Sequence, residues 1–144
     1  MTSAEAPARG DRWFRAIGYG LLAEIATIIT IILVAKLYRY VFVRGLTDSA
    51  YAAFDQRVGE IVGIVGGTLY TFLLAQRLMR HVSTRQIAHG VVVALAAVVL
   101  SVGGSIAGHQ GLPGGYLIAT PLKILAGVLA GFLATRTAPS RIGS

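Results

Sequence analysis

The sequence predicts an all-α integral membrane protein, with four transmembrane helices in an up-down antiparallel bundle and both termini in the cytoplasm (N-in/C-in). The first observation behind this fold class is the stretch 87–122, which includes no Asp, Glu, Lys or Arg. A transmembrane helix needs about 20 apolar residues to cross about 30 Å of hydrocarbon, so this stretch holds two helices around the Gly/Pro turn at 111–115. The second observation is composition, because 55% of the 144 residues are hydrophobic and 13% are charged, whereas soluble domains are about 25% charged.

The chain is predicted to be a single membrane domain, residues 1–144, that starts with a short tail. Residues 1–11 are small, polar and contain proline, so they are expected to form a flexible cytoplasmic tail. The apolar run that follows predicts a first span over about 16–43, which is too long for the apolar core of a secretory signal. Trp13 and Phe14 precede this run and are expected to anchor the helix at the membrane interface.

A second helix is expected to begin at residues 47–49, Thr-Asp-Ser, because all three side chains are good N-caps. Apolar residues recur on one face of 51–58, with charged residues between them. This segment is therefore predicted to lie on the membrane surface and to lead into a second span over about 58–78. The remaining two spans are predicted over about 87–106 and 116–135.

The topology follows from the distribution of lysine and arginine in the loops. With both termini inside, eight of these residues lie in the cytoplasm and four lie outside, which agrees with the positive-inside rule. The sequence therefore predicts a multi-pass protein of the cell inner membrane. The inside group is Arg9, Arg12, Arg15, Arg77, Arg80, Arg85, Arg136 and Arg141, and the outside group is Lys36, Arg39, Arg44 and Arg57.

Composition also excludes several classes of function. The formal net charge is +7, but the basic residues gather at the ends of apolar runs and form no basic stripe, so nucleic-acid binding is not predicted. The absence of cysteine excludes disulfides, thiolate metal sites and cysteine nucleophiles. No zinc-protease, phosphate-loop or serine-nucleophile motif occurs, so we predict neither an enzyme nor a metal site.

Glu24 is the main candidate for a functional residue. It lies in the middle of the first apolar run, about 10 Å from the cytoplasmic edge at 1.5 Å per residue. An ionisable group inside a membrane is expected to face the helix bundle and to have a partner. Gly20 and Thr27 share its helical face, which would be polar and closely packed. Two interpretations stay open, a glutamate that only holds helices together and one that takes part in transport.

Lys123 is the expected partner of Glu24. It lies about 10 Å from the outer edge of the fourth span, which leaves a gap of about 10 Å to Glu24 along the membrane normal. The long lysine side chain would close part of this gap, directly or through water. Glu60, near the outer end of the second span, competes for the same lysine.

Two pairs of glycines are candidates for helix packing, Gly63-x-x-x-Gly67 and Gly127-x-x-x-Gly131. Such small-xxx-small motifs allow close helix crossings, either within the chain or between copies. Haem ligation by His89 and His109 is not predicted, because the two histidines lie at opposite ends of one span and cannot reach the same iron. We therefore predict no cofactor, and leave open a bound lipid or pigment.

The tetrapeptide Leu22-Ala23-Glu24-Ile25, in the first of four short spans, resembles the first helix of the small multidrug resistance transporters. The resemblance implies a dual-topology dimer in which Glu24 binds a proton and a cationic drug in turn. It is confined to the first span. The aromatic-rich motif of that family's third span has no counterpart in 91–101, and the charge bias favours a single orientation.

The leading functional prediction is a small non-enzymatic inner-membrane protein that serves as a structural or accessory subunit of a larger membrane complex. It rests on the short loops, the missing catalytic motifs and the many glycines. The alternative is a small homo-oligomeric transporter or channel that uses intramembrane Glu24 with Lys123. A haem or quinone electron carrier is a third hypothesis. Expected partners are membrane lipids, and either other membrane subunits or further copies of the chain.

Overall fold

The computed structural model describes residues 11–42, 45, 47–82, 84–108 and 114–137, and the only regular secondary structure among these residues is helical. Each of its four long helices is long and apolar enough to cross a membrane, which is the architecture of a multi-pass membrane protein. These helices are α1 (Asp11–Leu37), α2 (Asp48–Met79), α3 (Gln86–Ala107) and α4 (Gly115–Thr137), and the π-helix η1 (Tyr38–Phe42) extends α1.

Among the described residues, the helices cover the predicted spans and extend beyond them, and residue 43, the last of the predicted first span, lies outside the described residues. Asp11, the last residue of the predicted tail, is the first residue of α1, and the rest of that tail lies outside the described residues. The surface segment predicted before the second span is not separate from it, because α2 runs without a break from Asp48 to Met79. The bounds of α3 and α4 differ from the predicted spans by two residues or fewer.

The start of α2 packs against the end of the first helix. Tyr38 in η1 stacks on Phe54 with ring centroids 3.6 Å apart. Arg39 forms an ion pair with Asp55, and its guanidinium lies 4.9 Å from the centre of the Tyr51 ring. Stacked rings and cation–π contacts each stabilise by about 0.5–1.5 kcal/mol. These contacts explain why the segment joins the bundle instead of standing alone as a surface helix.

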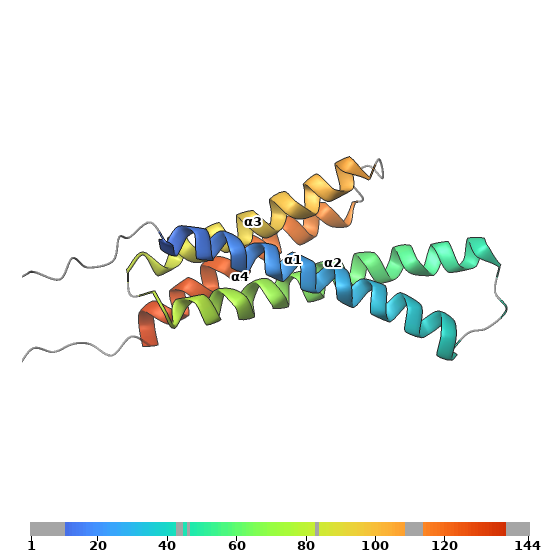
Figure 1. The fold of residues 1–144 in the computed structure, drawn as a ribbon, viewed down its shortest axis with the longest axis horizontal. Helices are drawn as coiled ribbons and strands as arrows, with labels where there is room; N and C mark the ends of the chain where they lie inside the picture. The colour runs from blue at the N-terminus through green and yellow to red at the C-terminus, as the bar shows by residue number, and fades with distance from the viewer. Residues whose placement is uncertain (1–10, 43–44, 46, 83, 109–113, 138–144) are drawn as a thin grey trace, which may run out of the picture.

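The four helices surround a shared centre. Helix α1 packs against α2 and α3, and α4 packs against the same two helices, so α1 and α4 occupy opposite corners. The start of α1, the end of α2, the start of α3 and the end of α4 lie together at the left of Figure 1. Towards the right of that view, the α1–α2 pair diverges from the α3–α4 pair.

Small residues let the helices approach closely at the convergent end. A Cβ atom built on Gly127 would lie 2.3 Å from the backbone oxygen of Gly90, and one built on Gly131 would lie 2.6 Å from the Cα of Ile87. The motif at 127 and 131 therefore packs α4 on α3 within the chain. The core cluster that seals this end is Ala16, Ala75, Leu78, Met79, Val82, Val93 and Ala130.

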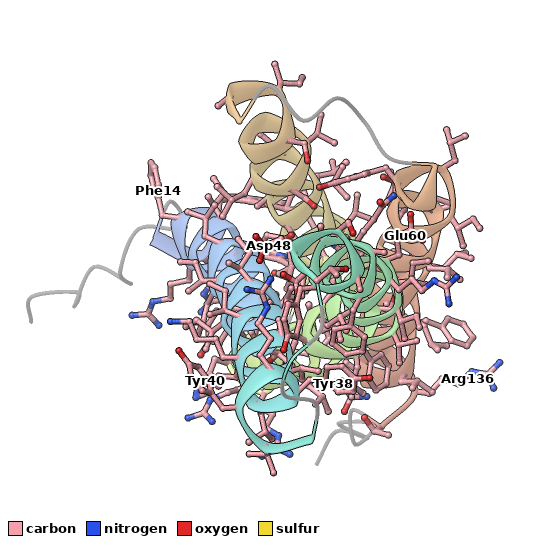
Figure 2. All side chains as sticks on the ribbon, turned by 90° about the vertical axis from the view of Figure 1, so that its right-hand side faces the viewer. Phe14, Tyr38, Tyr40, Asp48, Glu60 and Arg136 are labelled. Atoms are coloured by element: carbon pink, nitrogen blue, oxygen red, sulfur yellow. The ribbon has the colours of Figure 1, made fainter. Side chains whose placement is uncertain are left out.

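Large apolar side chains face outwards, as expected when hydrocarbon replaces water around the helices. Leu117 is 83% exposed and Val99 is 70% exposed, whereas the buried residues between the helices are mostly alanine and glycine. Phe14 is 76% exposed and, like Arg136, projects from the surface in Figure 2. Packing of small residues replaces the hydrophobic effect as the main source of helix association in lipid.

Candidate functional site

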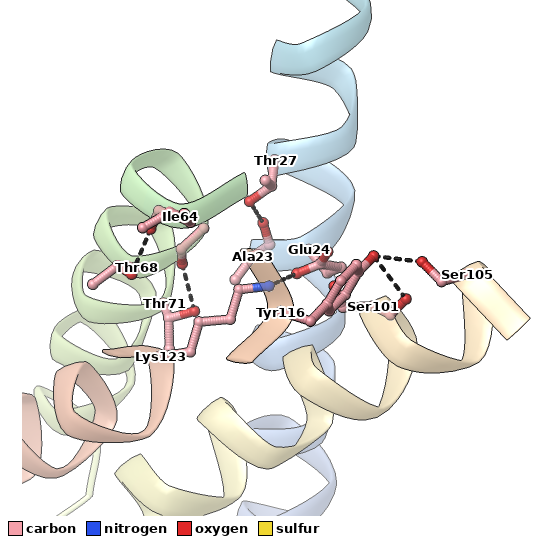
Figure 3. Close-up of polar contacts among 11 residues, drawn as sticks. Ala23, Glu24, Thr27, Ile64, Thr68, Thr71, Ser101, Ser105, Tyr116 and Lys123 are labelled. Carbon is pink, nitrogen blue, oxygen red and sulfur yellow. Dashed lines mark hydrogen bonds and ion pairs between the residues drawn. The ribbon is translucent and has the colours of Figure 1, made fainter. Parts of the chain in front are cut away.

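An ion pair joins the two helices that lie at opposite corners of the bundle. Lys123 on α4 donates a hydrogen bond from Nζ to Oε2 of Glu24 on α1, at 2.5 Å. The two side chains are only 3% and 6% exposed. Because α1 and α4 do not form a direct interface of their own within the described residues, the lysine side chain bridges the centre of the molecule (Figure 3).

This direct contact differs from the gap of about 10 Å that the predicted depths left between the two charges. The difference has a simple cause in the position of the first helix. Helix α1 begins at Asp11, five residues before the predicted span at 16. At 1.5 Å per residue, Glu24 is therefore about 7–8 Å farther from the start of its helix than predicted. The extended lysine closes the remainder.

Gly67 makes room for the lysine. A Cβ atom on Gly67 would lie 2.6 Å from Cε of Lys123, so any other residue at this position would push the side chain away. Thr27 lies one turn from Glu24 and is 1% exposed, but its hydroxyl donates to the backbone oxygen of Ala23 at 2.9 Å and does not contact the pair. The ion pair therefore receives no hydrogen bond from Thr27, and Gly67 leaves the space that the lysine side chain occupies.

A cavity of about 780 Å³ leads from the divergent end of the bundle to this ion pair. All four helices contribute to its walls, and much of the lining is polar or lacks a side chain. Gly63 belongs to this lining, and a Cβ there would meet nothing within 4 Å. Its motif partner Gly67 is buried against Lys123 of α4 and Thr27 of α1, so the two glycines of this motif have different surroundings. The polar lining residues are Glu24, Thr27, Asp55, Gln56, Glu60, Ser101, Ser105, Tyr116 and Lys123.

Hydroxyl groups form one wall of the cavity. Tyr116 on α4 donates to the backbone oxygen of Ser101 at 3.4 Å, and the hydroxyls of Tyr116 and Ser105 are 2.6 Å apart (Figure 3). Sequence reasoning missed Tyr116, which begins the fourth apolar run and resembles an interfacial anchor. The spacing of Ser101 and Ser105, four residues apart on one helical face, was the available signal.

Glu60 does not compete for Lys123 as predicted, because the lysine is bound to Glu24. The Glu60 side chain lies against the start of α4, where a Cβ atom on Gly115 would be 3.6 Å from Cγ of Glu60 (Figure 2). Among the described residues, no cation pairs with Glu60. The cavity therefore carries one uncompensated carboxylate near its mouth.

His89 lies at the other end of the molecule, where its ring stacks on Trp13 with centroids 4.1 Å apart. Its Nδ1 lies 3.0 Å from the backbone oxygen of Arg85, and its Nε2 is buried with no hydrogen-bond partner among the described residues. Trp13 is partly buried and packs on this histidine, and its predicted position at the membrane interface stays a prediction. His109 lies outside the described residues.

A second, apolar groove of about 740 Å³ lies between α2 and α4 on the outside of the bundle. It carries none of the charged groups of the cavity. Such a surface suits an acyl chain or a partner helix. Its lining is Ile64, Val65, Thr68, Leu69, Phe72, Leu122, Leu125, Ala126, Val128, Leu129 and Phe132.

No protein-family model, curated protein or solved structure matches this chain. The resemblance of residues 22–25 to small multidrug resistance transporters therefore receives no support from the comparisons. The functional argument rests on the geometry of the cavity and its ion pair.

The Arg39–Asp55 pair at the mouth is expected to contribute little to stability. Both side chains are partly exposed, and ion pairs in such positions are worth about 0.2–1 kcal/mol. We predict that Asp55→Asn lowers the free energy of unfolding by less than about 1 kcal/mol, as measured by denaturation in mixed micelles. A loss of several kcal/mol would show instead that Asp55 organises the outer end of the bundle.

Proposed function

We propose that this chain is a small non-enzymatic inner-membrane protein that binds a charged solute in its cavity and acts as a carrier, alone or as several copies. The observation that carries the proposal is an open cavity, lined in part by polar side chains, whose floor is a buried ion pair. Its volume of about 780 Å³ falls within the range of about 300–1,000 Å³ that is typical of small-molecule sites.

The energetics of buried charges support a functional role for the pair. Removing two charges from water costs several kcal/mol per ion, and a well-packed apolar pair is often equally stable or more so. The presence of a buried ion pair in a membrane domain is therefore weak evidence that the pair stabilises the fold. Ionisable residues inside membranes instead tend to mark pathways for solutes and ions.

The closed end of the bundle favours a carrier over an open channel. The cavity reaches Glu24 and Lys123, and beyond them the alanine-rich core and the Gly90–Gly127 contact bring the helices together. In our proposal the bundle is up-down and antiparallel, with both termini in the cytoplasm. The cavity then opens to the outer side, because the convergent end carries the termini and the loop rich in arginine.

Charge displacement on a solid-supported membrane tests this proposal. Proteoliposomes are exposed to a panel of small cations, anions and zwitterions. We expect at least one charge class to give a transient current with the wild-type protein, because a charged solute moves into a low-dielectric cavity. Glu24→Gln combined with Lys123→Met should abolish that current.

The control variant is Gly103→Ala, which lies outside the cavity lining and where an added Cβ meets nothing within 4 Å. It should leave the current unchanged. If no solute gives a current above that of protein-free liposomes, and none binds to the purified protein in calorimetry, the solute-binding function is wrong.

The apolar groove between α2 and α4 favours a second function, an accessory subunit of a larger membrane complex. In that case the groove would receive a helix of another subunit. Extraction in mild detergent should then recover stoichiometric partner proteins, identified by mass spectrometry. Recovery of a single monodisperse species containing only this chain would contradict the accessory role.

A further inference from the structure

We propose that the cavity takes a zwitterion, a ligand that carries an ammonium group and an acid group. The inference rests on the proposed solute-binding function and names its substrate class. In the bound state the ammonium group pairs with Glu24 and the acid group pairs with Lys123. The ligand thus inserts between two residues that contact each other directly in the structure.

Charge balance at the cavity floor selects this class. Glu24 and Lys123 are 6% and 3% exposed, and each is neutralised by the other. A ligand with one positive charge that pairs with Glu24 would leave the lysine buried and uncompensated. A ligand with one negative charge would do the same to the glutamate. A zwitterion replaces one ion pair by two and leaves no buried charge without a partner, which is the condition that low-dielectric surroundings impose.

The surroundings of Lys123 allow the pair to separate. The lysine lies against Gly67, and Gly63, one turn along the same helix, borders empty cavity. This face of α2 presents no side chain at either position, so the long aliphatic chain of the lysine has space for movement within the cavity. Glu24 is the more constrained partner because its carboxylate is carried on a shorter side chain.

The mouth of the cavity orients the ligand. Glu60 has no ion-pair partner among the described residues, whereas Asp55 is neutralised by Arg39. The Glu60 carboxylate in the cavity lining attracts the ammonium group of an incoming ligand. Glu60 therefore attracts the ligand to the cavity, and Glu24 and Lys123 bind its two charged groups.

A zwitterion can be a free solute or the headgroup of a phospholipid such as phosphatidylethanolamine. Both carry an ammonium group and an acid group. The two helix pairs diverge towards one end of the bundle (Figure 1). Asp55, Ser105 and Gly115, which lie near that end, belong to the cavity lining. The experiment must therefore separate the two sources.

Three ligands of the same chain length test the charge requirement: 4-aminobutyrate, butylamine and butyrate. Binding to the purified protein in an uncharged maltoside detergent is measured by calorimetry. Loss of one partner of a buried pair typically costs 3–5 kcal/mol, so 4-aminobutyrate should bind at least about 100-fold more tightly than either single-charge analogue. In parallel, native mass spectrometry compares retention of phosphatidylethanolamine with that of anionic phosphatidylglycerol.

Two double variants identify the site. Glu24→Gln with Lys123→Met removes both charges and should abolish zwitterion binding. Glu24→Lys with Lys123→Glu reverses the pair and should keep the preference for the zwitterion, because both charges still have partners. Thermal unfolding of each variant verifies that the fold is present. Glu60→Gln should weaken zwitterion binding by a smaller factor than the loss of Glu24 or of Lys123.

Each result decides the question. Tight binding of 4-aminobutyrate supports a free zwitterion, and selective retention of phosphatidylethanolamine alone supports a headgroup. Butylamine or butyrate binding as tightly as 4-aminobutyrate overturns the zwitterion but leaves the solute-binding function in place. Failure of all soluble ligands and of both lipids overturns the zwitterion, and the proposed function falls with it only if the current measurement also fails.

Discussion

Lys123→Met is expected to lower the free energy of unfolding by about 3–5 kcal/mol, because it leaves the Glu24 carboxylate buried without a partner. Methionine fills much of the volume of the lysine chain, so lost packing contributes little. Denaturation with increasing mole fractions of dodecyl sulfate in mixed micelles measures the loss. Lys36→Met is the matched control, and it should change stability by no more than about 0.5 kcal/mol because Lys36 is exposed.

The double variant Glu24→Gln with Lys123→Met separates the cost of an orphan charge from the value of the pair. It should recover most of the stability lost in Lys123→Met, since no unpaired charge then remains in the core. If the double variant is as unstable as the single one, the ion pair itself stabilises the fold, and the case for a functional role is weakened. If Lys123→Met costs nothing, water or another group compensates Glu24.

Gly127→Val is expected to have the second large effect. A Cβ at this position would lie 2.3 Å from the Gly90 backbone oxygen, so valine must separate α3 from α4. Overpacking a tight contact typically costs 1–3 kcal/mol, and backbone atoms can relax less than side chains. We expect a loss of about 3 kcal/mol or a failure to recover monodisperse protein, judged by size-exclusion chromatography and the same denaturation assay.

Gly103→Val is the matched control on α3, because an added Cβ at Gly103 meets nothing within 4 Å. It should leave both yield and stability nearly unchanged. A different outcome would reveal a contact between copies. If Gly127→Val yields a stable monomer where the wild-type protein is a dimer, then Gly127 packs between chains and not within one.

Much of the architecture could be predicted because it depends on local composition. The four apolar runs predicted four long helices, since a run of about 20 apolar residues has few other stable states in lipid. Glu24 and Lys123 could be selected as candidates for the same reason, because each charge interrupts an apolar run. No arrangement in space was needed for either prediction.

Other features depend on which helix faces meet, and the sequence did not reveal them. Trp13 stacks on His89, seventy-six positions along the chain, and no local pattern indicates this contact. Tyr116 was not selected from the sequence, and it lies on the wall of the cavity. An aromatic ring at a helix end suits the membrane interface as well as a packed interior, so the type of residue alone could not distinguish them.

The sequence by itself determined that the chain forms four membrane-length helices and that two opposite charges lie within them, because both properties belong to single segments. Only the tertiary structure decided that α1 and α4 occupy opposite corners, that Gly67 makes space for the lysine, and that a cavity ends at the pair. The physical reason is that a span is specified by the free energy of transferring its own residues into lipid. A contact across the bundle is specified by the close packing of several helices at once.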